Sequence, residues 1–421
     1  MKPLVILLGL LSLTLSVRAN DDKLAVPDKD KYGFYITGNR HWARIPFQLH
    51  SNLIIVQVRV NDSDTLHFIL DTGVSHTIIT DPASLDRKSL RMTRKIQLNG
   101  AGEGSNLTAS VAIDNRLSVG ALRVAHHNVV ILDEDILKLS EYVGTPVDGI
   151  FGYEIFANFV VNIDFQAREI MLIDPKKYRY RKHKGDRYPI TIHNTKVYTD
   201  ALSVYDGEKS MPLRVILDTG AGHALLLDRS RSTATMPMPE KSIRAQLGRG
   251  LNGVINGTMG RIEKIKFGRY ELDDVLASFP DSASFGMKLI DMPERQGNVG
   301  CELLRRFNVT FNYRDRYVVL KPNKRAMRER FEHDMSGMEL RARGEHYRKY
   351  FVDNVTVGSP AHLAGLQEGD ELMFVNNTST GELTISDIYK VLQKGEGRVV
   401  TILVRREGRI IVTDFTLKRL I

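Results

Sequence analysis

Short apolar segments separated by polar turns dominate the first three quarters of the chain. These segments are rich in β-branched residues, and segments of this kind are typical of β-strands. Sustained helical periodicity is scarce here, and residues 133–142 give the best short helix candidate. The pattern therefore predicts a mainly β protein. The predicted strands are 53–60, 66–70, 160–165, 170–173, 201–205, 213–217 and 317–320.

Two stretches of this β-rich region match each other at a nearly constant offset. Phe-Ile-Leu-Asp-Thr-Gly at residues 68–73 corresponds to Val-Ile-Leu-Asp-Thr-Gly at residues 215–220, an offset of 147. Gly-Ile-Phe-Gly-Tyr-Glu at 149–154 corresponds to Gly-Asn-Val-Gly-Cys-Glu at 297–302, an offset of 148. A shared spacing over such a length indicates a duplicated unit.

Each Asp-Thr-Gly follows an apolar strand, so we expect Asp71 and Asp218 to be buried. A buried carboxylate is costly unless its charge is held or shared. Two such groups face to face cannot both ionise readily, so the pair keeps one proton over a wide pH range. One carboxylate can then take a proton from a bound water while the other donates one to a carbonyl oxygen.

The other residues of the two motifs are predicted to support this pair. Glycine lets the backbone turn tightly beside the carboxylate and directs its N–H inward. Threonine offers a hydroxyl that can bond across the interface to the opposite loop. The predicted supporting residues are Thr72, Gly73, Thr219 and Gly220.

At these motifs the sequence resembles the aspartic proteases, the clan of retroviral proteases and pepsins, over residues 43–322. The resemblance implies a bilobal fold with a β-barrel-like lobe around each motif. It also implies that Asp71 and Asp218 form the catalytic dyad and that Thr72 and Thr219 make crossed hydroxyl bonds. The implied activity is endopeptidase hydrolysis of a peptide or protein substrate by a dyad-activated water, with no cofactor, no metal and no covalent intermediate. One chain suffices for the active site, because it carries both motifs.

Two features depart from the pepsin-like pattern. Val74 and Ala221 follow the two motifs where pepsin-like enzymes usually have serine or threonine. A hydroxyl that donates to a carboxylate lowers its pKa, so its absence predicts a pH optimum nearer neutral than in pepsins. Asn298 is polar where the resemblance leads us to expect an apolar residue.

The segment at residues 96–113 also differs from the flap of pepsin-like proteins. No tyrosine occurs between residues 96 and 113, and the glycine-rich segment 100–104 resembles the flap tip of retroviral proteases. We therefore hypothesise two mobile flaps, with an ordinary glycine-rich hairpin turn as the alternative. The glycines concerned are Gly100, Gly102 and Gly104 in the first repeat and Gly248, Gly250 and Gly253 in the second.

Two histidines and a single cysteine complete the candidate chemistry. His76 and His223 match between the repeats but lack a third ligand at a recognisable spacing. They are interpreted as residues that orient the active-site loops or face solvent, and no metal site is predicted. Cys301 is interpreted as a small buried residue, and a single cysteine excludes an internal disulfide.

Residues 323–421 follow a different pattern, with a predicted amphipathic helix at 384–393 and a hairpin at 398–417. Ser-Pro-Ala at 359–361, Ala-Gly-Leu at 364–366 and Gly-Asp at 369–370 resemble a PDZ domain. The resemblance implies a bound peptide that adds as an extra strand, its terminal carboxylate held by backbone N–H groups. A role as spacer or lobe clamp is the alternative. The residues that resemble the carboxylate loop are Gly337, Met338, Glu339 and Leu340, with Glu339 in place of a glycine.

The N-terminus and the composition indicate the compartment. Lys2 precedes an apolar run over residues 4–17 and small residues before position 20, which predicts a secretory signal peptide cleaved after Ala19. The run is short for a permanent span, and a retained anchor is the alternative. We expect an exported protein, periplasmic or secreted, and the lack of disulfides favours a bacterial periplasm. Net charge is +9, but no nucleic-acid motif accompanies it.

These observations together predict a secreted aspartic endopeptidase with a PDZ module for peptide tethering or regulation. The alternative is a non-catalytic peptide-binding or adaptor protein led by its PDZ domain. The predicted parts are a signal peptide at 1–19, an N-terminal extension at 20–43, a first lobe at 44–175, a basic linker at 176–187, a second lobe at 188–322, and a linker with the PDZ domain at 323–421.

Overall fold

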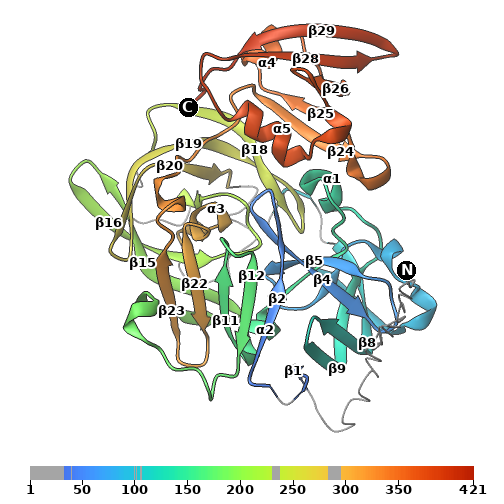
Figure 1. Cartoon of the computed structure of the whole chain (residues 1–421), viewed down its shortest axis with the longest axis vertical. Helices are drawn as coiled ribbons and strands as arrows, with labels where there is room; N and C mark the ends of the chain where they lie inside the picture. Colours follow the sequence, from blue (N-terminus) through green and yellow to red (C-terminus); the bar gives the residue numbers. More distant parts are fainter. Residues whose placement is uncertain are drawn as a thin grey trace, which may run out of the picture. The chain divides into compact units, whose positions relative to one another are not determined.

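The computed structural model describes residues 33–38, 40–98, 100, 102–104, 107–229, 238–282 and 295–421 (Figure 1). The predicted signal peptide lies outside the described residues. Strands arranged in several sheets dominate the part of the chain that the structure describes, so the predicted mainly β class is confirmed. No helix among these residues has the length and apolar character needed to cross a membrane.

The first repeat forms one sheet. Its strands are β1 (Tyr35–Ile36), β3 (Gln48–His50), β4 (Leu53–Val60), β5 (Leu66–Asp71), β6 (Ile78–Ile79), β7 (Arg91–Leu98), β8 (Leu107–Val119), β9 (Leu122–Leu132) and β10 (Gly149–Gly152). Its helices are η1 (Pro82–Ser84), η2 (Arg87–Ser89), α1 (Leu139–Val143) and α2 (Tyr153–Asn158). The strand order is β1-β9-β6-β10-β5-β4-β8-β7, with β3 paired to β4 and β9 also paired to β8.

The second repeat forms a corresponding sheet. Its strands are β14 (Thr191–His193), β15 (Lys196–Asp206), β16 (Lys209–Leu217), β17 (Leu225–Leu227), β18 (Ser242–Gly250), β19 (Gly253–Phe267), β20 (Tyr270–Pro280) and β21 (Gly297–Val299), followed by α3 (Cys301–Leu304). The order β14-β15-β16-β21-β17-β20-β19-β18 repeats the order β3-β4-β5-β10-β6-β9-β8-β7 of the first sheet. The duplication seen in the sequence is therefore a duplication of topology.

A third sheet combines strands from both repeats. Its strands are β2 (Trp42–Pro46), β11 (Val160–Asp164), β12 (Glu169–Ile173), β13 (Asp186–Pro189), β22 (Phe307–Asn312) and β23 (Tyr317–Pro322). Their order is β13-β23-β22-β11-β12-β2, so the repeats meet where β11 pairs with β22 (Figure 1). The basic segment 176–187 contains η3 (Lys182–Lys184) and leads into β13. One buried apolar cluster includes residues of both repeats, which this shared sheet brings together.

A close backbone contact fixes the end of β5, where the first aspartate lies. β5 and β10 run parallel, with Asp71 opposite Gly152. A Cβ added at Gly152 would lie 1.6 Å from the carbonyl oxygen of Asp71. Only glycine permits this approach, and β16 and β21 form the corresponding parallel pair in the second repeat.

The predicted strands are confirmed with small shifts at their ends, but the predicted helix at 133–142 is wrong over its first half. Only α1 forms, and the residue before it, Lys138, has a left-handed backbone with φ of 51°. The N–H of Lys138 donates to Asp135 Oδ1 at 3.0 Å. An aspartate that captures a nearby N–H offers the backbone an alternative to helical bonding, which explains the late start of α1.

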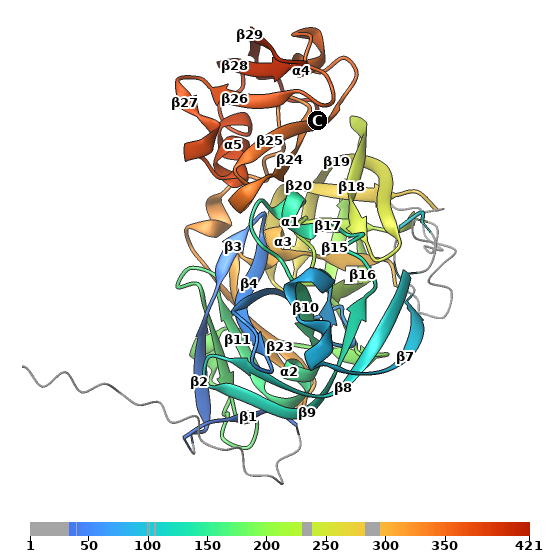
Figure 2. The same cartoon turned by 90° about the vertical axis from the view of Figure 1, so that its right-hand side faces the viewer.

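The C-terminal module has its own sheet and its own buried apolar cluster. Its elements are η5 (Ala326–Arg328), β24 (Met338–Arg343), η6 (Glu345–Tyr347), β25 (Lys349–Val355), α4 (Pro360–Leu363), β26 (Glu371–Val375), β27 (Thr378–Ser379), η7 (Thr380–Glu382), α5 (Ile385–Leu392), β28 (Val399–Arg406) and β29 (Arg409–Thr416). The order is β24-β25-β26-β28-β29, with β27 paired to β26 (Figure 2). β24 is therefore an edge strand, and the N–H of its Leu340 donates to the hydroxyl of Tyr389 on α5.

Candidate active site

Four hydrogen bonds join the two Asp-Thr-Gly loops. Thr72 Oγ1 accepts from the N–H of Thr219 at 3.0 Å and donates to the Leu217 carbonyl at 2.6 Å. Thr219 Oγ1 accepts from the N–H of Thr72 at 3.0 Å and donates to the Leu70 carbonyl at 2.8 Å. Both threonine side chains are fully buried. Because every bond crosses between the repeats, the two loops fix each other's position.

The crossed loops bring the carboxyl groups of Asp71 and Asp218 together, since a Cβ added at Gly73 would lie 2.9 Å from Asp71 Oδ1 and 3.5 Å from Asp218 Oδ1. The N–H of Gly73 donates to Asp71 Oδ1 at 2.5 Å, and the N–H of Gly220 donates to Asp218 Oδ1 at 3.0 Å. A Cβ added at Gly220 would lie 2.2 Å from the carboxyl carbon of Asp71, so this position requires glycine. The structure therefore gathers the six residues of both motifs into one cluster.

The electrostatics of this pair keep a proton on it near neutral pH. Burial and, after it, the neighbouring Asp218 carboxyl raise the pKa of Asp71 to about 7. The Lys196 ammonium and the N–H of Gly73 act in the opposite direction and limit the rise. Lys196 also donates to the Gly73 carbonyl, which holds its charge beside the first motif. Two adjacent carboxyl groups with one shared proton are the arrangement that acid–base hydrolysis needs.

Asp218 has a side-chain hydrogen-bond donor, Asn298, that the matching position of the first repeat does not provide. Its Nδ2 donates to Asp218 Oδ2 at 2.8 Å, and its side chain is buried. The corresponding residue of the first repeat is Ile150, which has no donor. Asn298, which departs from the expected apolar pattern, thus supplies a side-chain hydrogen-bond donor to the site. Val74 and Ala221 supply none, because neither has a hydroxyl group. Sequence reasoning noted the departure but not this contact.

A second set of bonds surrounds the loops and was not predicted. Asn52 Nδ2 donates to the Gly222 carbonyl at 3.1 Å and to Glu302 Oε2 at 2.6 Å. The hydroxyls of Ser75 and Thr195 lie 2.5 Å apart. Both contacts run from one repeat to the loop of the other. No sequence signal identifies them, because the partners lie 120 to 250 positions apart.

The matched histidines have different surroundings. His76 is exposed, whereas His223 is partly buried, and burial lowers its pKa while the nearby Asp218 raises it. Of the two alternatives left open by the sequence, facing solvent applies to His76 and not to His223. Over the described ranges, no three metal-ligating side chains gather into a site.

Cys301 is fully buried, as the sequence suggested. Its thiol donates to the Thr219 carbonyl at 3.3 Å, so it packs directly behind the second motif. Burial raises the pKa of this thiol well above its ordinary value, with further contributions from Asp218 and Asp71. A thiol that resists ionisation is a poor nucleophile, which agrees with a structural role.

The predicted flap segments lie at the tips of two hairpins, β7–β8 and β18–β19 (Figure 2). The tips contact each other. Gly100 N–H donates to Asn252 Oδ1 at 3.0 Å, and Gly104 N–H donates to the Asn252 carbonyl at 2.5 Å. Gly102 lies against the backbone of Asn252 and Gly253. Gly248 and Gly250 belong to β18, and Gly253 is the first residue of β19.

Val74 connects the first hairpin to the active-site loop. It belongs to a buried apolar cluster that includes Leu107 on β8, and the partly buried Leu98 and Leu251 pack against this cluster. Leu98 ends β7, and Leu251 lies at the tip of the opposite hairpin. The bulky side chain that replaces the usual hydroxyl therefore packs against the hairpins instead of bonding Asp71.

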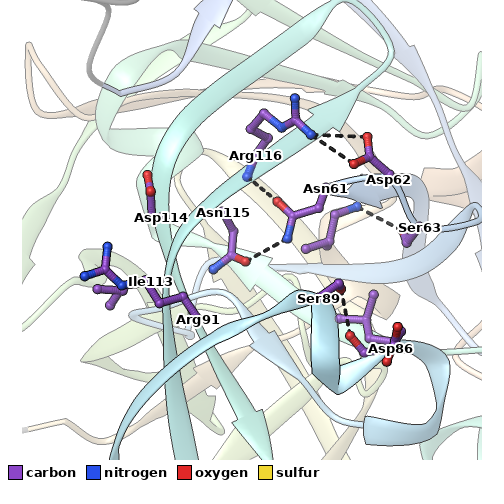
Figure 3. Close-up of a pocket in the computed structure, with 12 residues that line it drawn as sticks. Asn61, Asp62, Ser63, Asp86, Ser89, Arg91, Ile113, Asp114, Asn115 and Arg116 are labelled. Carbon is purple, nitrogen blue, oxygen red and sulfur yellow. Dashed lines mark hydrogen bonds and ion pairs between the residues drawn. The ribbon is translucent and has the colours of Figure 1, made fainter.

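A pocket on the first repeat lies apart from these residues (Figure 3). Its lining includes Asn61, whose Nδ2 donates to Asn115 Oδ1 at 2.9 Å, and Arg116, which bonds Asp62 at 3.1 and 3.2 Å. Its polar groups are largely paired with one another, and neither aspartate of the dyad lines it. The dyad, and not this pocket, is the candidate site.

Comparison with known families agrees with the geometry. A family described as "Aspartyl protease" matches residues 56–155 and 204–303, and a PDZ domain family matches residues 351–406. The chain carries two aspartyl protease domains and a C-terminal PDZ domain. The predicted fusion is therefore confirmed. Each protease domain contributes one Asp-Thr-Gly motif to the dyad.

Individual proteins of known name match short segments of the chain. The tight junction protein ZO-3 of Canis lupus familiaris is 30% identical over 95 residues, and those of Mus musculus and Homo sapiens are each 28% identical, over 96 and 95 residues. Each match covers 23% of this chain and 10% of the relative, so it spans about a tenth of those proteins. A solved photosystem II D1 C-terminal processing protease matches at 23% identity over 20% of this chain and 22% of its own, with a TM-score of 0.19.

The crossed hydroxyl bonds predict a large effect of Thr72→Val. The variant keeps the side-chain shape but leaves the N–H of Thr219 and the carbonyl of Leu217 without their partner in a buried site. We expect the free energy of unfolding to fall by about 2–4 kcal/mol. Urea denaturation measures this, with the exposed Thr65→Val as the matched control. Equal stability of the two variants would contradict the prediction.

Proposed function

We propose that this protein is an exported aspartic endopeptidase that hydrolyses peptide bonds in a peptide or protein substrate. The observation that carries the proposal is the close approach of the carboxyl groups of Asp71 and Asp218, one from each protease domain, on either side of Gly73. Export rests on the sequence of residues 2–19 alone. Both Asp-Thr-Gly motifs keep their aspartate, which favours an active enzyme over a peptide-binding protein that has lost its activity.

The surroundings of the two carboxyl groups suggest a division of labour. Asp218 accepts from both Asn298 and Gly220, and donors to a carboxylate favour its ionised form. Asp71 has a raised pKa, so it carries the shared proton. In the proposed reaction Asp218 takes a proton from the attacking water, while Asp71 protonates the oxygen of the scissile carbonyl. When the C–N bond breaks, the amine leaves with the proton from Asp218, and Asp71 regains its own from the hydroxyl.

The PDZ domain contacts the first protease domain through charged and aromatic side chains. The Arg341 guanidinium lies 4.6 Å from the ring centre of Tyr142, and Arg343 Nε lies 3.5 Å from Glu141 Oε2. The hydroxyl of Tyr142 accepts from Arg249 Nε at 2.8 Å, and Arg249 belongs to the second hairpin. These contacts favour a regulatory role for the module, because they connect it to a hairpin of the candidate active site.

The proposed activity predicts that Asp71→Asn and Asp218→Asn each abolish cleavage of an unbiased peptide library. We expect a loss of at least about a hundredfold, since each variant removes an acid–base group. Mass spectrometry of the digested library measures it, and cleavage by the unsubstituted protein should be sensitive to pepstatin. Asp148→Asn, a carboxylate outside the dyad, is the control and should retain activity. Cleavage that persists in both dyad variants, or none by the unsubstituted protein between pH 3 and 8, would contradict the proposal.

The division of labour predicts the pH dependence of kcat/KM. Activity should fall as the pH rises through about 7, because Asp71 then loses the proton that it must donate. In Asn298→Ile the Asp218 carboxyl group loses a buried hydrogen-bond donor that holds the proposed base in place. We expect kcat/KM to fall about tenfold.

The control for this experiment is Ile150→Val, at the corresponding position of the first repeat, which neither adds nor removes a donor. Its kcat/KM should equal that of the unsubstituted protein. An Asn298→Ile profile identical to that of the unsubstituted protein would overturn the role given to Asn298.

A further inference from the structure

The edge of the PDZ sheet at which a peptide would add is covered by the protease part of the same chain. A PDZ ligand adds as an extra strand along an edge strand beside a helix. Here the edge strand is β24, and α5 lies beside it, because the N–H of Leu340 donates to the Tyr389 hydroxyl on α5 at 2.9 Å. We call β24 together with α5 the peptide edge. It packs against α1 and Gly144 of the first protease domain.

Gly144 contacts both elements of the peptide edge. A Cβ added to it would lie 2.5 Å from Ile385 Cγ2 on α5 and 3.8 Å from Ala342 Cβ on β24. Both neighbours are buried, so neither can turn out into solvent to make room. Gly144 also has a left-handed backbone, with φ of 75°, where it ends α1. Glycine therefore meets two requirements here, the backbone conformation and the close approach to the PDZ domain.

Two arginines of β24 contact side chains of α1. Arg343 Nε lies 3.5 Å from Glu141 Oε2, and the Arg341 guanidinium lies 4.6 Å from the ring centre of Tyr142. Arg341 Nε also lies 2.6 Å from Asp353 Oδ1 on β25, which orients its guanidinium. A guanidinium over an aromatic ring is attracted to the electrons of the ring. The acid and the ring of α1 thus meet complementary groups on the peptide edge.

The core of the first protease domain holds α1 in this position. Val143 on α1 is 3% exposed and belongs to a buried apolar cluster with Ile55, Ile69 and Val147. Ile69 lies on β5, two positions before Asp71. The segment that covers the peptide edge is therefore packed onto the strand that carries the first aspartate, and its position does not depend on the PDZ contacts alone.

A separate peptide and α1 compete for the same edge. A strand that pairs with β24 would lie about 4.8 Å from it, where α1 and Gly144 already pack. A peptide can then bind only in the fraction of molecules in which α1 has moved away. The apparent Kd is the intrinsic Kd divided by that fraction. A change that loosens α1 from β24 should therefore tighten peptide binding, even when the PDZ domain itself is unchanged.

We propose that the peptide edge of the PDZ domain is a docking surface for the chain's own α1 and Gly144. The module thereby clamps the first protease domain and is closed to separate peptides while α1 is in place. The partner that this surface fits once α1 is displaced is an extended peptide that adds to β24. The inference concerns binding only, so it stands or falls independently of the proposed peptidase activity.

The test follows hydrogen–deuterium exchange of β24, residues 338–343, by mass spectrometry on the full chain as a pool of random decapeptides is added. A peptide that adds to β24 slows exchange of this strand, whereas a peptide at the candidate active site does not cover it. Asp218→Asn is present throughout so that the probes are not cleaved. Gly144→Asn loosens α1, because asparagine tolerates a left-handed backbone but its Cβ would collide with Ile385. We expect the apparent Kd of the pool to fall by about tenfold or more.

Gly207→Asn is the matched control. Gly207, between β15 and β16, also has a left-handed backbone, with φ of 57°, but a Cβ there would have no atom within 4 Å. The control therefore makes the same demand on the backbone without the collision. Its apparent Kd for the pool should equal that of the chain with both glycines intact.

Two outcomes would overturn the proposal. One is a chain with Gly144 intact that binds the pool at β24 as tightly as the Gly144→Asn variant does. The other is a folded Gly144→Asn variant, verified by its melting curve, that binds no more tightly than the control. If this variant does not fold, Tyr142→Ala removes the ring that Arg341 contacts and leaves the PDZ sequence unchanged. It should lower the apparent Kd by a smaller factor, and an unchanged value counts against the proposal.

Discussion

The crossed hydrogen bonds of Thr72 and Thr219 determine the geometry on which the candidate active site depends. Each hydroxyl bonds an N–H and a carbonyl of the opposite repeat, so neither loop reaches its position alone. The two aspartates directly before these threonines consequently meet, although they lie 147 positions apart in the sequence. The raised pKa of Asp71 follows from burial and from this enforced proximity to Asp218.

The duplicated frame carries a dyad whose two halves are not equivalent. Asn298 donates to Asp218, whereas the matching Ile150 offers Asp71 nothing. Val74 fills space against the hairpins where a hydroxyl donor would be expected. The two matching loops thus place the carboxyl groups, and the different neighbours of each group make the two chemically different. The structure needs both motifs to build the site, whereas the proposed reaction needs one acid and one base.

Local signals predicted most of the fold, because short apolar runs between polar turns are typical of strands and the repeat identified the paired aspartates. The predicted helix at 133–142 was wrong over its first half, because Asp135 accepts a hydrogen bond from the N–H of Lys138 and the helix begins only at Leu139. Contacts such as Asn52 with Glu302 could not be predicted, because they join residues 250 positions apart without any pattern.

The central claim is that the crossed loops bury the Asp71 carboxyl group beside Asp218, so that Asp71 keeps its proton near neutral pH. The most direct measurement is a pH titration of the protein with ¹³C-labelled aspartate carboxyl groups, followed by NMR, with Asp71→Asn to assign the Asp71 resonance. The account predicts that the Asp71 carboxyl stays protonated until the pH approaches about 7 and that Asp218→Asn lowers this value. An Asp71 carboxyl that titrates near the ordinary aspartate pKa of about 3.9 would contradict it.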